Sequence, residues 1–117
     1  MSFPDPHQYK VIAAGATERI YYLRVPDEMV GFVTNIGNNS FTDTSLDIKM
    51  DGESLEGLPI QREIGPIKSP TQFDPPFVVN RKIEVFGKNN DTVAHTFEVV
   101  IMGYFLPRSY FVLGEDD

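Results

Sequence analysis

Few residues in the sequence have the type and spacing that metal binding or catalysis requires. There is no cysteine, and the histidines are His7 and His95. A histidine metal site on a strand needs a second histidine two positions from His95, because a His-x-His pair points both imidazoles to one face. Val93 and Phe97 stand at those positions. We therefore predict that His95 is a structural histidine, buried or at a rim, and we expect no metal site and no cofactor.

A group of acidic residues between positions 43 and 56 is the next candidate for chemistry. Calcium takes several oxygen ligands from one tight loop, and the group lacks the D-x-[DN]-x-[DN]-G pattern of such a loop. Glycoside hydrolysis requires two carboxylates that face each other across a cleft, and the sequence marks no such pair. We interpret the group as a solvated charged face; its members are Asp43, Asp47, Asp51, Glu53 and Glu56.

Motifs for nucleophilic catalysis and phosphate binding are missing. The sequence has no G-x-S-x-G, no Walker loop and no G-x-G-x-x-G after a strand. Glycosylation sequons begin at Asn38 and Asn90, and both are interpreted as turn residues, because Asn is a favoured turn former. The prediction is a protein without catalytic residues, and therefore not an enzyme.

Composition limits the partners that the protein can have. Its 117 residues include 17 acidic and 10 basic ones, for a formal charge of −7. That balance repels phosphate backbones, so nucleic acid is not an expected partner. No apolar stretch approaches the roughly 18 residues that cross a membrane, and the N-terminus has no signal-peptide pattern. We expect a soluble product that is not exported by the usual route and has no membrane partner.

The pattern of elements is that of β-structure. Nine glycines and nine prolines interrupt the chain, and β-branched and aromatic residues fill the intervals. Asp51-Gly52 predicts a tight type I′ turn, since Gly accepts positive φ. Pro75-Pro76 predicts entry into a strand from a sheet rim, and a kink is predicted at Asn80 if 77–88 forms two strands. Strands are predicted at 8–14, 18–25, 29–36, 45–51, 55–65, 77–88 (one long strand or two) and 92–106.

Seven or eight short strands with frequent turns predict an all-β fold. The expected architecture is a two-sheet antiparallel β-sandwich, either jelly-roll-like or immunoglobulin-like. The Cys…Trp…Cys signature of immunoglobulin domains is absent, which favours the jelly roll. One domain is expected over 1–117, with short arms at 1–7 and 107–117. Period-2 placement predicts a core that includes Val11, Ile20, Phe32, Leu46, Ile48, Ile83, Val85, Phe97, Val99 and Ile101.

Aromatic residues keep a second function class open. The chain has nine Phe and five Tyr but no Trp. A carbohydrate- or receptor-binding sandwich presents aromatic platforms that most often include Trp, so the absence of Trp weakens this alternative. The positions of four tyrosines distinguish the sugar-binding hypothesis from the assembly hypothesis. If the four side chains line a solvent-filled groove, sugar binding is favoured, and if they are buried between subunits, assembly is favoured. These residues are Tyr21, Tyr22, Tyr104 and Tyr110.

The C-terminal segment is unusually apolar for a chain end. Residues 104–113 carry seven large apolar side chains, interrupted by Pro107, Arg108 and Ser109. Such a segment requires cover from its own domain or from a neighbour. Pro107 ends a predicted strand, and the stretch "SYFVL" (109–113) that follows is either a final strand of the sandwich or an arm that docks on a partner. The docking hypothesis places Tyr110, Phe111, Val112 and Leu113 against another subunit or a shell protein, with the acidic tip 114–117 in solvent.

Three stretches of the chain are similar to one family. "VIAAGATERIYYLRVPDEMVGFVTNIGN" (11–38), "IKMDGESL" (48–55) and "FDPPFVVNRKIEVFGKNNDTVAHTFEVVIMGY" (73–104) resemble the small β-sandwich accessory proteins of tailed-phage virions, such as head-decoration proteins. The resemblance lies in the order of turns and strands and supplies no functional residue. It implies a virion protein made in the host cytoplasm, homo-oligomeric and bound to other subunits of a larger particle.

Overall fold

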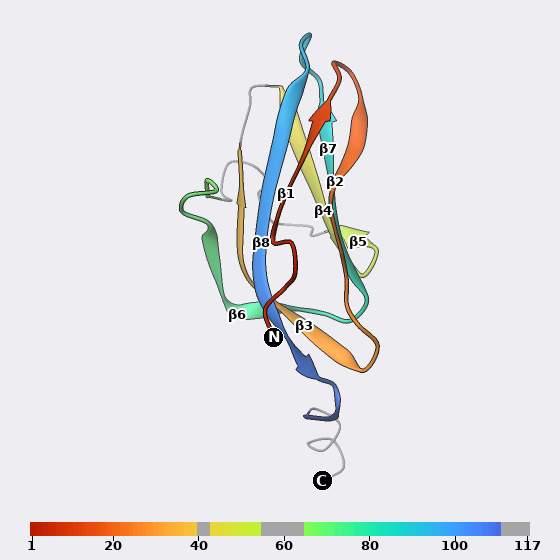
Figure 1. Ribbon diagram of the computed structural model, residues 1–117. Coiled ribbons are helices and arrows are strands. Elements are labelled where there is room, and N and C mark those ends of the chain that lie inside the picture. The colour runs from red at the N-terminus through yellow and green to blue at the C-terminus, as the bar shows by residue number, and fades with distance from the viewer. Residues whose placement is uncertain (40–42, 55–64, 111–117) are drawn as a thin grey trace.

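The computed structural model describes residues 1–39, 43–54 and 65–110, and these residues form eight strands (Figure 1). None of them belongs to a helix with the length and hydrophobicity that crossing a bilayer requires. The predicted strand at 55–65 falls almost wholly outside the described residues. The strands are β1 (His7–Ile12), β2 (Thr17–Arg24), β3 (Met29–Asn38), β4 (Thr44–Met50), β5 (Glu53–Ser54), β6 (Thr71–Val79), β7 (Lys82–Asn89) and β8 (His95–Pro107).

The strands form two four-stranded sheets. The first sheet has the order β1-β8-β3-β6 and the second has the order β2-β7-β4-β5, and all pairs are antiparallel. The pairing is nested, because β1 to β4 pair with β8, β7, β6 and β5 respectively. Nested pairing across two sheets is the arrangement of a jelly roll. The predicted all-β, two-sheet antiparallel sandwich is confirmed.

Apolar side chains from both sheets fill the space between them. Eight of the ten predicted core residues are buried, namely Ile20, Leu46, Ile48, Ile83, Val85, Phe97, Val99 and Ile101. On β4 the predicted alternation is also confirmed, with Leu46, Ile48 and Met50 in the core. The turn after β4 has positive φ at both central residues, 57° at Asp51 and 86° at Gly52, as a type I′ turn requires.

Two predicted core residues lie elsewhere. Val11 is 60% exposed, and its neighbour Ile12 is buried instead. Because both positions are apolar, periodicity did not determine which one faces inward. Phe32 is only half-buried and stacks on Tyr104, with ring centroids 5.3 Å apart. The register of β3 shifts between Val33 and Asn35, and this irregularity reverses the alternation, so that Val33 and Ile36 fill the core.

The proline pair lies inside β6 rather than before it. β6 is an edge strand of the first sheet, where missing backbone donors are tolerated. Its pairing with β3 jumps from Phe77 to Gln72, so the residues between them leave the regular ladder. The stretch 77–88 is divided between β6 and β7, with the break at 80–81.

The N-terminal residues lie along β8, although the sequence suggested an arm at 1–7. Ser2 bridges to Tyr104, and the Phe3 N–H donates to the Gly103 carbonyl at 3.0 Å. The Phe3 ring is buried and packs against Phe105, with ring centroids 4.9 Å apart. The segment is therefore an additional part of the core.

The Gln8 side chain joins the two sheets at one corner of the sandwich. Its amide oxygen accepts the Tyr22 N–H at 3.1 Å, and its amide nitrogen donates to the Tyr22 carbonyl at 3.1 Å. Tyr22 belongs to β2, which is an edge strand of the second sheet. The Gln8 amide thus bonds to that edge as a neighbouring strand would.

Candidate functional site

The predicted partner-contact segment begins at the end of the sandwich where β8 finishes (Figure 1). Tyr110 is 65% exposed, and Phe111, Val112 and Leu113 lie outside the described residues. Arg108 is in a turn, and Ser109 and Tyr110 have helical backbone, so β8 does not continue. Most of the segment after Pro107 lies outside the described residues, so both alternatives for it, a final strand and a docking arm, stay predictions.

Arg108 anchors the start of this segment. Its N–H donates to the Glu28 carbonyl at 2.7 Å, which ties it to the turn between β2 and β3. Its guanidinium donates to the Met29 carbonyl at 3.1 Å and to Asn80 Oδ1 at 3.3 Å. The chain therefore leaves the domain from a fixed point.

A pocket of about 390 Å³ lies beside this anchor. Four cationic side chains line it, namely Arg24, Arg81, Lys82 and Arg108, together with the acids Asp27 and Glu28. The remaining lining residues are Tyr22, Val25, Pro26 and Asn80. The chain has only 10 basic residues and a formal charge of −7, so this concentration of cations is unusual for the molecule. We call this site the basic pocket.

Asp51 holds the turn that presents two of these cations. Its carboxylate accepts the backbone N–H groups of Asn80 at 3.0 Å, Arg81 at 2.6 Å and Lys82 at 3.1 Å. Partial burial opposes ionisation, but these three bonds and the Arg81 charge outweigh it and lower the pKa of Asp51 below 3.8. Asp51 is thus a structural carboxylate, whereas the sequence placed it on a solvated face.

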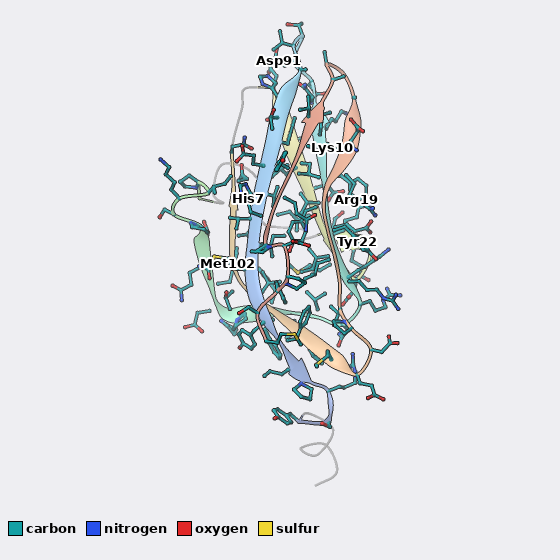
Figure 2. All side chains as sticks on the ribbon, in the orientation of Figure 1. His7, Lys10, Arg19, Tyr22, Asp91 and Met102 are labelled. Carbon is teal, nitrogen blue, oxygen red and sulfur yellow. The ribbon has the colours of Figure 1, made fainter. Side chains whose placement is uncertain are left out.

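A second group of charges extends from the pocket along β2 and β7. Glu84 contacts Arg19 Nη1 at 3.2 Å and Lys82 Nζ at 3.2 Å. The Arg19 guanidinium lies 4.5 Å from the centre of the Tyr22 ring, and Figure 2 shows the two residues side by side on β2. Burial opposes ionisation of Glu84, but its bonds to Lys82 and Arg19 lower its pKa. This carboxylate remains ionised and holds both cations.

His95 occupies the opposite end of the sandwich. Its Nε2 lies 2.8 Å from Asp91 Oδ2, and Figure 2 shows Asp91 far from the C-terminal end. The hydrogen bond with His95 lowers the pKa of Asp91. The pair links the β7–β8 turn to the start of β8, which is a structural role. Within residues 1–39, 43–54 and 65–110, no three His, Asp or Glu side chains form a group that could hold a metal ion.

The four tyrosines whose positions distinguish sugar binding from assembly lie in different parts of the structure. Tyr21 is fully buried, and its hydroxyl has no hydrogen-bond partner among the described residues. Burial, with a smaller contribution from the Asp5 charge, raises the pKa of Tyr21. Tyr22 lines the basic pocket, Tyr104 stacks on Phe32, and Tyr110 is exposed. They do not line a common groove.

One of the two sequon asparagines is not a turn residue. Asn38 is 2% exposed inside β3, and its N–H donates to the Gly65 carbonyl at 3.0 Å. A buried strand position overrode the turn preference of Asn. Asn90, in contrast, is exposed just after β7.

The outer face of the first sheet carries an apolar surface. Tyr9 and Val11 on β1 are 70% and 60% exposed, Val78 on β6 is 55% exposed, and Met102 on β8 is 45% exposed. Strand register places them on the same face as the Phe32–Tyr104 stack. We call these six residues the outer apolar face.

Sequence reasoning missed both the basic pocket and the outer apolar face. The four cations are separated by up to 84 positions, from Arg24 to Arg108, so no local pattern joins them. One signal was present: Arg24 and Arg108 lie near the ends of predicted strands, and Arg81 and Lys82 follow the predicted kink at Asn80. The outer apolar face was hidden because Val11 and Phe32 were assigned to the core.

No protein-family model matches the sequence, and no curated protein sequence is similar enough to count as a relative.

Proposed function

We propose that the protein is a non-enzymatic structural subunit that assembles through protein–protein contacts, as an accessory protein of a virion such as a capsid-decoration protein. The outer apolar face carries this proposal. Monomeric soluble proteins rarely expose contiguous apolar surface without a binding role. Val78 and Met102 flank the aromatic stack, and Tyr9 and Val11 are exposed further along the same sheet face, opposite Glu98 and Thr96 of β8. Apolar side chains of this size on one face fit a surface that is covered by another subunit.

The jelly-roll arrangement and the apolar C-terminal segment support the same proposal. Jelly rolls serve in viral capsid proteins and also in lectins, so the fold alone does not separate assembly from sugar binding. A sugar-binding groove would bring several tyrosines together, but these residues lie at separate positions. Assembly is therefore the function that we favour.

The test is the mass of the full chain in solution, by analytical ultracentrifugation over a range of concentrations. We expect an oligomer, and we expect Met102→Lys to weaken it because a charge is placed in the outer apolar face. Val93→Lys is the matched control, since Val93 is 55% exposed but lies outside that face, before β8. A chain that stays monomeric, alone and with purified particles, would contradict the proposal.

A further inference from the structure

The basic pocket combines a concave shape with a local reversal of charge. Its walls carry four cationic and two anionic side chains, while the chain as a whole is strongly acidic. Like charges gathered in a concavity raise the local concentration of counter-ions. The pocket is therefore suited to an anionic ligand, although the surface around it repels long polyanions.

Two of the guanidinium groups are held in place before any ligand arrives. Arg108 bonds to Met29 and Asn80, and Arg81 Nη2 donates to the Asp51 carbonyl at 2.8 Å. A guanidinium has five N–H donors, and these bonds to described residues use only some of them. A carboxylate is the anion whose two oxygens match the remaining fork of donors.

Arg24 provides a third cation, which is only weakly held. Its guanidinium lies 3.9 Å from Asp27, and both side chains are largely exposed, so this pair is weak. Arg24 can therefore turn to an incoming carboxylate at little cost. A fixed pair of guanidinium groups with one adaptable neighbour favours several carboxylates in a row over a single small anion.

We propose that the basic pocket binds the carboxylates of an acidic peptide segment, and that the segment is Glu115, Asp116 and Asp117 of a second copy of this chain. This inference rests on the proposed function, because it specifies one contact through which copies associate. The three acids are consecutive in the sequence, so their charge complements the pocket. The proposed contact replaces the earlier expectation that residues 114–117, the acidic tip, stay in solvent.

The length of the chain allows this contact. Glu115 is five residues beyond Tyr110, and an extended chain covers about 17 Å over that distance. Arg108 lines the pocket and also begins the segment, so two copies related by a two-fold axis near this end can exchange their tips. In this arrangement Tyr110 to Leu113 would contact the second copy, as the docking hypothesis from the sequence expects.

The experiment uses charge reversal in the full chain. One variant reverses the pocket (Arg24→Glu with Arg81→Glu), and another reverses the tip (Glu115→Lys, Asp116→Lys and Asp117→Lys). Each variant alone should associate about tenfold more weakly than the wild type, because several exposed ion pairs each contribute a few-fold. An equimolar mixture should associate like the wild type, since each altered pocket then meets a lysine tip and each unaltered pocket meets an acidic one.

The controls separate charge from folding. Lys68→Glu with Lys88→Gln changes exposed lysines outside the pocket and should leave association unchanged. Melting temperatures identify any variant that does not fold, and the neutral pair Arg24→Gln with Arg81→Gln replaces the reversed pocket in that case. Added salt should weaken wild-type association.

Three results would overturn the inference. If the wild type associates and the pocket variant associates equally well, the pocket is not the contact, while the proposed function stands. If both variants dissociate but their mixture stays monomeric, the acidic tip does not act between copies. If the wild type itself is monomeric at every concentration, this inference and the proposed self-association fail together.

Discussion

Gly103 is the position where one added methyl group should do most damage to the sandwich. A Cβ at this position would lie 2.5 Å and 2.7 Å from Cε2 and Cζ of Phe3, and it would overlap the carbonyl oxygen of Phe32. The Phe3 ring can move only by leaving the core, and the Phe32 contact involves backbone of the paired strand. Gly103→Ala therefore disturbs the N-terminal segment and the β3–β8 pair at once.

The magnitude follows from these two contacts. Exposing the Phe3 ring forfeits about 1.5–3 kcal/mol of burial, and forcing an extra methyl into packed structure costs about 1–3 kcal/mol. Because partial movement of the ring relieves part of the second cost, we expect Gly103→Ala to lower the free energy of unfolding by about 2–4 kcal/mol. At roughly 4 °C per kcal/mol for a domain of this size, the melting temperature should fall by about 8–16 °C.

Urea denaturation followed by circular dichroism measures the effect, and Gly31→Ala is the matched control. Gly31 also lies in the β3–β8 pair, opposite Phe105, but its nearest neighbours would be 3.5 Å from the new methyl. That variant should be neutral or slightly stabilised, because alanine restricts the unfolded chain. The reasoning is refuted if Gly103→Ala stays within 1 kcal/mol of the wild type, or if both variants lose equal stability.

Three further predictions concern the Asp51 carboxylate, the Tyr21 hydroxyl and the effect of a chelator. Asp51→Asn should lower the free energy of unfolding by about 1–2 kcal/mol at pH 7, since charged hydrogen bonds at a partly exposed site are weakened by water. The folded pKa of Asp51 is lowered below 3.8, so its stabilisation is complete above that pH and is lost as pH falls through the folded value. Urea titrations at pH 7 and pH 2.5 should show the variant and wild type converging in acid; a constant difference would contradict this. Tyr21→Phe should leave stability unchanged or raise it by about 1 kcal/mol, because the buried hydroxyl has no partner among the described residues; a clear loss in urea would reveal one. A chelator should not change the melting temperature, and a fall that added calcium or zinc reverses would show that a metal supports the fold.

The fold was largely predictable because its signals are local. The apolar residues Leu46, Ile48 and Met50 alternate with polar ones, and this pattern of neighbouring residues predicts a strand with one buried face. The Asp51-Gly52 turn is predicted from two adjacent positions. The errors lie where tertiary structure decides. The irregularity in β3 that turns Phe32 outward has no signature in the sequence, and packing chose Ile12 over Val11.

The candidate site was less predictable because it is assembled from chain segments that are far apart. Arg24 is the last residue of β2, Arg81 lies in the turn after β6, and Arg108 comes directly after the end of β8. Only the nested strand order brings these three places to one end of the sandwich. A charge count cannot find such a pocket, since the average over the whole chain is acidic.

The Gln8 amide has a consequence for how copies of this protein can meet. An unpaired strand edge invites another chain to extend the sheet, which is a route to fibres and irreversible aggregates. Gln8 occupies part of the β2 edge, and the prolines of β6 remove backbone donors from another. At these two borders a neighbour finds few main-chain bonds to continue. Copies that meet at these two borders are left to join through side chains, so that each keeps its own closed fold and can separate again without unravelling.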